Sequence, residues 1–208
     1  MTSDKLPTLL GGFVALLAAA TLSHLFHAGW GACAAPSEPL AYLFAGLMLA
    51  ISPFAAKRHC FLTDVSVSAC AQWVVLIVVG ITLAAATNTH LGIDPLFGEY
   101  GNCSAVASAP SISLGSVIGL LMLSVSGVSV VFNTTRFPKR LRWFGAALMG
   151  LGLSALCGHM WGIPELGLGF GQGLAQTSLF ASVALAVSGA GCYVLGAGAR
   201  VTQCSTDV

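Results

Sequence analysis

Apolar residues run along this chain in six long blocks, separated by short polar or basic stretches. An α-helix of about 20 apolar residues crosses the hydrocarbon core of a bilayer with every backbone polar group satisfied internally. Each block reaches approximately that length, so we predict six membrane-spanning helices. The predicted segments cover approximately residues 8–28, 38–55, 68–89, 112–132, 141–160 and 174–195.

The overall composition agrees with this pattern. Hydrophobic residues make up 56% of the 208 residues and charged residues only 7%, which is far from the usage of a soluble domain. We therefore predict an all-α integral membrane protein with a single membrane domain over residues 1–208. The first block could instead belong to a cleaved signal peptide, but it is long enough to span the membrane. The net charge of +1 and the lack of a basic tract argue against nucleic-acid binding.

The basic residues occur only at alternate junctions between the blocks. They lie before the first predicted helix, between the second and third, between the fourth and fifth, and after the sixth: Lys5, Lys57, Arg58, Arg136, Lys139, Arg140, Arg142 and Arg200. Cytoplasmic loops carry the excess of Lys and Arg in membrane proteins. We therefore predict that both termini are cytoplasmic.

One stretch of the sequence occurs twice, with a weaker third copy. Residues 35–50 read A-P-S-E-P-L-A-Y-L-F-A-G-L-M-L-A, residues 109–124 read A-P-S-I-S-L-G-S-V-I-G-L-L-M-L-S, and the third copy begins near Leu174. Each copy would start the second helix of a helical hairpin. We predict three repeated hairpins, over approximately residues 8–56, 68–133 and 141–197. Their outer tips differ in length, and we expect any ligand to bind there.

The predicted hairpin tips carry recurring glycine, histidine and tryptophan residues. Gly29, Gly92 and Gly162 follow the first helix of each hairpin and are predicted to end it in the left-handed conformation. The ligand-binding candidates near these turns are His24, His27, Trp30, His90, Asp94, His159 and Trp161. These side chains allow two interpretations. They could be interfacial caps and membrane anchors, or they could form a site for a proton, a metal, haem or a quinone-like ligand.

Several functional classes lack the residues that they require. No Asp, Glu, Lys or Arg falls at the middle of a predicted helix, which disfavours ion-coupled transport. No P-loop, nucleophile elbow, paired carboxylates or HExxH motif is present, so we do not expect an enzyme. The cysteines form no CxxC pair, and we predict no metal site. Cys33 and Cys103 lie in predicted outer loops and could form a disulfide if that side is oxidising.

The repeated helix starts resemble those of the multi-pass membrane sensor modules found N-terminal to PAS, histidine kinase and diguanylate cyclase domains in bacteria. Second helices of that family typically open with P-N-T-A-L-x-F-L-L-x-G-L. Pro36-Ser37, Leu40, Tyr42-Leu43 and Gly46-Leu47 match or conservatively replace this pattern, and Leu91-Gly92-Ile93-Asp94 and Trp161-Gly162-Ile163-Pro164 resemble its turns. The family's Asn-Thr pair is replaced in every copy.

The resemblance implies a sensory or regulatory module of the bacterial inner membrane that detects a ligand or the state of the membrane at its outer face. No kinase or cyclase domain follows Arg200 in this sequence, so we expect output through a protein partner or a homodimer, or a longer chain. The alternative is a redox or accessory subunit of a larger membrane complex, with haem or quinone held near the tip histidines. Only this alternative specifies a cofactor.

Overall fold

The computed structural model describes residues 5–27, 37–58, 61–87, 113–131, 137–163 and 178–204, which form six α-helices. The helices are α1 (Lys5–His27), α2 (Ser37–Arg58), α3 (Phe61–Thr87), α4 (Leu114–Val131), α5 (Phe137–Trp161) and α6 (Leu179–Cys204). All six are long and apolar enough to cross a membrane. The prediction of six such helices is therefore confirmed.

Apolar side chains occupy the outward surface of the bundle as well as its interior. Leu9, Leu16 and Leu76 are examples of large apolar residues that are exposed, as expected where lipid covers the outer faces of helices. Serine hydroxyls inside the helices bond back to carbonyl groups one turn earlier. Ser52 Oγ, for example, donates to the Met48 carbonyl at 2.6 Å, which satisfies a polar atom that lipid cannot.

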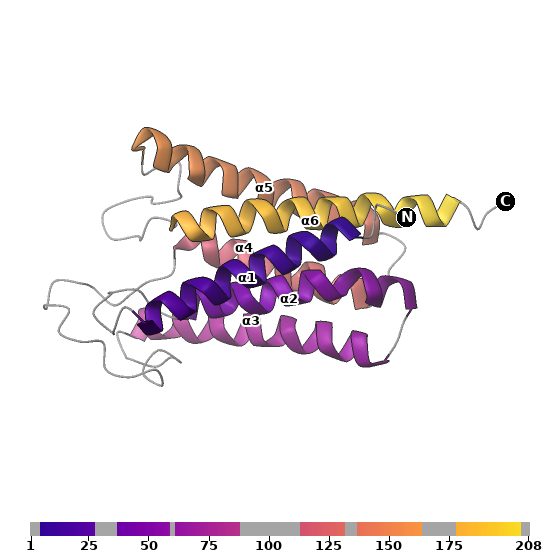
Figure 1. Ribbon diagram of the computed structural model, residues 1–208, viewed down its shortest axis with the longest axis horizontal. Coiled ribbons are helices and arrows are strands. Elements are labelled where there is room, and N and C mark those ends of the chain that lie inside the picture. Colours follow the sequence, from indigo (N-terminus) through magenta and orange to yellow (C-terminus); the bar gives the residue numbers. More distant parts are fainter. Residues whose placement is uncertain are drawn as a thin grey trace, which may run out of the picture.

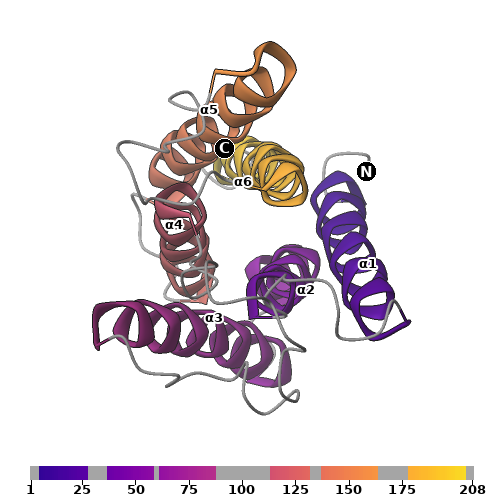
Figure 2. The same cartoon turned by 90° about the vertical axis from the view of Figure 1, so that its left-hand side faces the viewer.

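The six helices form an inner group of three and an outer group of three (Figure 2). The inner helices α2, α4 and α6 each contact the other two, while α1 packs on α2 and α6, α3 on α2 and α4, and α5 on α4 and α6. In the membrane-spanning segments of α2, α4 and α6, 56%, 50% and 56% of residues are buried, against 28%, 28% and 33% for α1, α3 and α5. The second helix of each predicted hairpin thus lies at the centre.

Successive helices run in opposite directions, so that α1 begins and α6 ends at the same end of the bundle (Figure 1). We call this the basic end, because the basic residues of the helices lie toward it: Lys5, Lys57, Arg58, Lys139, Arg140, Arg142 and Arg200. The opposite end, where α2, α4 and α6 begin, is the tip end. The side of the membrane that each end faces stays a prediction.

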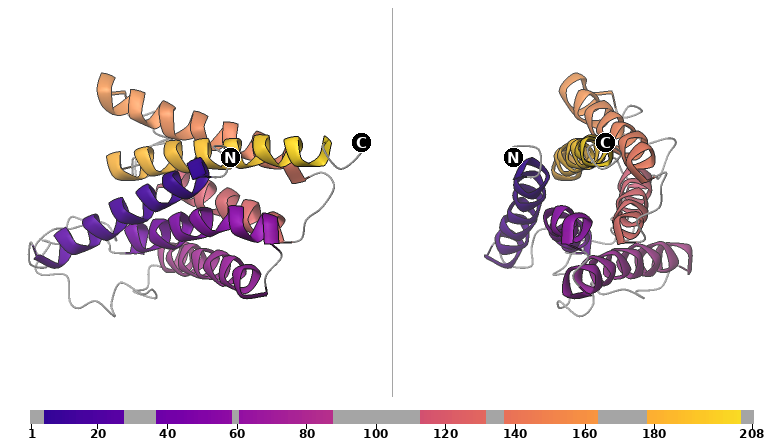
Figure 3. Two further views of the ribbon diagram at one scale, coloured as in Figure 1. Left: turned by 45° about the vertical axis from the view of Figure 1, so that its right-hand side comes forward. Right: turned by 90° about the vertical axis from the view of Figure 1, so that its right-hand side faces the viewer.

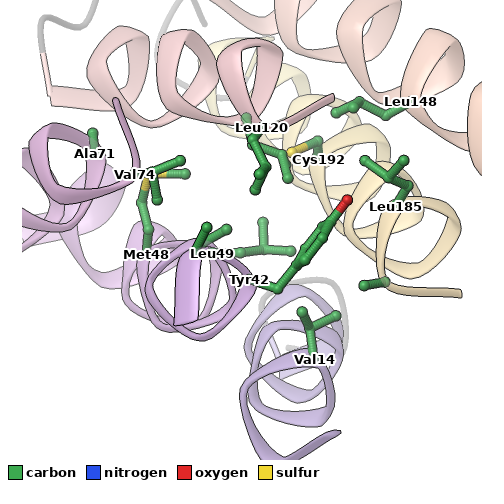
Figure 4. Packing of buried hydrophobic residues seen from close by; sticks show 14 of the residues in the cluster. Val14, Tyr42, Met48, Leu49, Ala71, Val74, Leu120, Leu148, Leu185 and Cys192 are labelled. Carbon is green, nitrogen blue, oxygen red and sulfur yellow. The ribbon is translucent and has the colours of Figure 1, made fainter. Parts of the chain in front are cut away.

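Glycines of α4 make room for large side chains of the other two inner helices. A Cβ atom at Gly119 would overlap the Leu185 side chain of α6, and one at Gly127 would overlap the Met48 side chain of α2. Met48 and Leu185 belong to the buried core (Figure 4). The small residues of α4 therefore let the core side chains of its neighbours fill the centre.

The first and third hairpins also contain direct backbone contacts at glycine. A Cβ at Gly46 would lie 2.6 Å from the Ala15 backbone nitrogen in α1, and one at Gly189 would lie 2.5 Å from the Met149 nitrogen in α5. Such close approach increases the van der Waals contact that holds membrane helices together. Gly162 ends α5 with φ of 66°, and the Ile163 N–H donates to the Gly158 carbonyl at 2.9 Å. This confirms the predicted cap there; Gly29 and Gly92 lie outside the described residues.

Candidate functional site

The structure tests the predicted tip cluster only in part. Trp30, His90 and Asp94 lie outside the described residues, as do Cys33 and Cys103 of the predicted disulfide. Those assignments stay predictions.

The remaining candidates are on two outer helices. His24 and His27 lie toward the end of α1, and His159 and Trp161 lie at the end of α5, so all four positions are at the tip end. His159 is half-buried, and Trp161 is 68% exposed. Because α6 lies between α1 and α5 (Figure 2), the fold does not set His159 opposite His24 or His27. Among the described residues no group of three or more His, Cys, Asp or Glu could hold a metal ion. The haem or quinone alternative stays a prediction.

A different polar group joins the three inner helices at the tip end. Glu38, in the first turn of α2, is partly buried, and both of its carboxylate oxygens accept hydrogen bonds from other helices. Ser116 Oγ of α4 donates to Oε1 at 2.8 Å. Ser178 Oγ, just before α6, donates to Oε2 at 3.4 Å. We call Glu38, Tyr42, Ser113, Ser116 and Ser178 the carboxylate cluster.

Two serines of the cluster also cap the helices that they precede. Ser113 Oγ accepts a hydrogen bond from the Ser116 backbone N–H at 3.1 Å and donates to Ser116 Oγ at 2.9 Å. Ser178 Oγ accepts from the Ala181 backbone N–H at 3.1 Å. Serine is favoured at this position because its side chain satisfies an N–H group that the helix leaves free. The chain of hydrogen bonds therefore runs from the caps of α4 and α6 to the carboxylate of α2.

Tyr42 lies one turn after Glu38 on α2, and its side chain is fully buried. Its ring packs edge-on against Phe180 of α6, with the centroids 5.4 Å apart, and its hydroxyl points away from α2 toward α6 (Figure 4). Ser116 and Glu38 are its polar neighbours, but no residue that the structure describes makes a hydrogen bond of normal geometry with this hydroxyl. A buried, unpaired hydroxyl is costly and requires an explanation.

The surroundings of the Glu38 carboxylate supply positive potential without a basic residue. The described lysines and arginines lie toward the other end of the bundle. Glu38 instead lies in the first turn of α2 and beside the first turns of α4 and α6. The N-terminus of an α-helix carries the equivalent of about half a positive charge. Three helix starts and two hydroxyl donors therefore offset part of the cost of burying the carboxylate.

Glu38 is not among the candidates that the sequence predicted, because a carboxylate at the start of a predicted helix, next to a predicted outer loop, is an ordinary feature. The available signal was its place within the repeated helix start. Glu38 occupies the position that Ile112 and Thr177 hold in the other two copies, two residues before the leucine that all three share. Only the packing of α2 between α4 and α6 shows that the carboxyl faces the other two helices.

The fold and the cluster define the class of this chain: an all-helical, multi-pass membrane protein with a polar site among its three central helices. Comparison with protein-family models, curated proteins and solved structures found no match. The resemblance to bacterial sensor modules therefore stays a prediction.

Proposed function

We propose that the protein is a sensory or regulatory membrane module that detects a ligand or the state of the membrane at its tip end and acts through its basic end. The observation that carries the proposal is the carboxylate cluster. A single carboxylate on α2 accepts hydrogen bonds from α4 at 2.8 Å and from the start of α6 at 3.4 Å. A change at this one group would alter the packing of all three central helices.

Helix α6 supplies a route from the cluster to the basic end. It begins next to Ser178 and continues to Cys204, whereas its membrane-spanning segment ends at Gly198. Its last turns extend past the neighbouring helices (Figure 3). Because an α-helix is a rigid element, movement at its start is transmitted along its length. We propose that this helix communicates with a cytoplasmic output, a protein partner or a second copy of the chain.

The proposed architecture is three copies of one hairpin. Two residues after the leucine that the copies share stand Tyr42, Ser116 and Ala181, and all three have an exposed fraction of 0%. Copies of a unit that place corresponding residues at a common centre are expected of a repeat protein. The basic end would face the cytoplasm of a bacterial cell. The resemblance to sensor modules and the unequal tip loops support the same function.

Hydrogen exchange measured by mass spectrometry in lipid nanodiscs tests the proposal. Glu38→Gln removes the charge but keeps the size of the side chain, and it weakens the hydrogen bonds from Ser116 and Ser178. We expect faster exchange at the start of α6 and also in its last turns, residues 199–204. Ser154→Ala is the control, because among the described residues Ser154 Oγ bonds only the Leu151 carbonyl of its own helix, at 2.9 Å. An effect of Glu38→Gln confined to the tip end would contradict the proposed coupling.

A further inference from the structure

We infer that the starts of α4 and α6 form a binding site for a small monocarboxylate, and that the carboxyl group of Glu38 occupies this site when no external ligand is bound. The inference names the ligand class of the proposed sensory site. The effect of ligand binding on the protein rests on the proposed function, whereas the binding itself does not.

The groups that meet at the cluster are hydrogen-bond donors. Ser116 Oγ and Ser178 Oγ both donate to the carboxylate, at 2.8 Å and 3.4 Å. The hydroxyl of Ser116 is oriented by Ser113, whose Oγ donates to it at 2.9 Å, and the backbone N–H of Ser116 bonds back to Ser113 Oγ at 3.1 Å. Hydroxyl donors at helix N-termini make a site that favours an anion.

One donor of the cluster is left over after Glu38 is accommodated. The Tyr42 hydroxyl is fully buried and makes no hydrogen bond of normal geometry with the residues that the structure describes, although the Ser116 hydroxyl lies close to it. Ser116 and Glu38 are its polar neighbours. An external carboxylate that replaced the Glu38 carboxyl could accept from Tyr42 as well as from the serines. The tethered carboxyl of Glu38 leaves that donor unused.

The chemistry of the site selects a carboxylate of single charge. Phosphate and other dianions are usually bound with Arg or Lys, and the described lysines and arginines lie toward the opposite end of the bundle. The group that the site holds in this structure is the carboxyl group of Glu38, bound through both of its oxygens. The packing of Tyr42 against Phe180, 5.4 Å between centroids, favours a short carbon chain over a long one.

Chemical rescue tests the site directly. Glu38→Ala removes the tethered carboxyl, and the unfolding midpoint of the purified protein is followed by tryptophan fluorescence as sodium formate or acetate is added. We expect a saturable rise of about 2–4 °C, the shift that about 1 kcal/mol produces in a protein of this size. The wild-type protein, whose own carboxyl competes, should need a higher concentration of the same anion. If Glu38→Ala does not fold, Glu38→Gln replaces it, since its neutral amide competes less than the native carboxylate.

Three controls decide the outcome. Sodium chloride at equal ionic strength tests whether any anion raises the unfolding midpoint. Acetamide tests whether a neutral molecule of similar shape to acetate does so. Adding Ser116→Ala to the Glu38 variant should raise the half-maximal formate concentration about tenfold, as the loss of one hydrogen bond to a charged group predicts. The inference is overturned if chloride or acetamide acts as strongly as formate, if no saturable rise occurs, or if Ser116→Ala leaves the response unchanged.

Hydrogen exchange in the same samples separates this inference from the proposed function. A saturable rise in the unfolding midpoint with no change at residues 199–204 would support the carboxylate site and contradict its sensory role. A change at residues 199–204 in Glu38→Gln, with no response of any variant to formate or acetate, would support the coupling and overturn the ligand class.

Discussion

Alanine at Gly11 should destabilise the protein, whereas alanine at the neighbouring Gly12 should not. A Cβ atom at Gly11 would lie 2.7 Å from the Gly46 carbonyl oxygen and 2.9 Å from the Ala50 Cα atom of α2, while one at Gly12 would meet no atom of the other described residues within 4 Å. The two glycines are adjacent in α1 and have the same intrinsic helix propensity. The pair of variants therefore isolates the contact between α1 and α2.

The structure sets the size of the expected difference. Ordinary van der Waals contact begins at 3.4 Å, so the two distances at Gly11 fall short of it by about 0.5–0.7 Å. Helices α1 and α2 would have to move apart by about this distance to accept the Cβ atom. Such a gap forfeits about a quarter to a half of the attraction between the other facing atoms. Overpacking of this kind costs about 1–3 kcal/mol. Alanine recovers about 1 kcal/mol of helix propensity at both positions. Gly11→Ala should therefore be less stable than Gly12→Ala by about 1–3 kcal/mol.

Reversible unfolding in mixed detergent micelles, followed by far-ultraviolet circular dichroism, measures this difference. A second matched pair repeats the test in α5. A Cβ at Gly145 would lie 2.7 Å from the Gly189 carbonyl oxygen, and one at Gly150 would meet no atom within 4 Å in the part of the chain that the structure describes. Equal stability of the two members of each pair, or a larger loss at Gly12 or Gly150, would refute the glycine contacts described for these hairpins.

Three further predictions concern the cluster and the topology. Ser178→Ala should cost about 1–2 kcal/mol in the same unfolding assay, because it removes a helix cap together with a hydrogen bond to Glu38; no loss would contradict the cap. Tyr42→Phe should leave stability unchanged or raise it by about 1 kcal/mol, because it removes a buried hydroxyl without a partner, and a loss of 2 kcal/mol or more would show that this hydroxyl is bonded. The lysines are Lys5, Lys57 and Lys139, so a membrane-impermeant amine reagent should modify the protein in inside-out vesicles but not in right-side-out vesicles; lysine modification in right-side-out vesicles would overturn the orientation.

Hydropathy alone located the six helices, but their ends follow different physics. The third helix was predicted to start near residue 68, yet α3 starts at Phe61, because backbone hydrogen bonding continues through the polar Thr63 and Asp64. The sixth was predicted from residue 174, yet α6 starts at Leu179, where Ser178 caps it. Length and apolarity determine that a segment can span a membrane, whereas capping determines where its helix begins.

The sequence could not reveal which helices lie inside the bundle. Lipid and neighbouring helices are both apolar, so α1 and α2 have similar patterns although the shares of buried residues in their spans are 28% and 56%. The position of Glu38 depends on that distinction, because its carboxyl meets Ser116 and Ser178 only when α2 lies between α4 and α6. The tip histidines were predicted as ligand candidates from their residue type and their recurrence at the hairpin tips, and neither property specifies which helix faces meet.

The most direct test of the account is a double-mutant cycle between Glu38 and the two serines that donate to it. Unfolding free energies are measured for Glu38→Gln, Ser116→Ala, Ser178→Ala and each pair, with Ser154→Ala as the unrelated partner. We expect a coupling of about 1.5–3 kcal/mol between Glu38 and Ser116, a smaller coupling with Ser178 across 3.4 Å, and none with Ser154. Coupling between Glu38 and both serines no larger than that with Ser154 would contradict the claim that one carboxylate joins the three central helices.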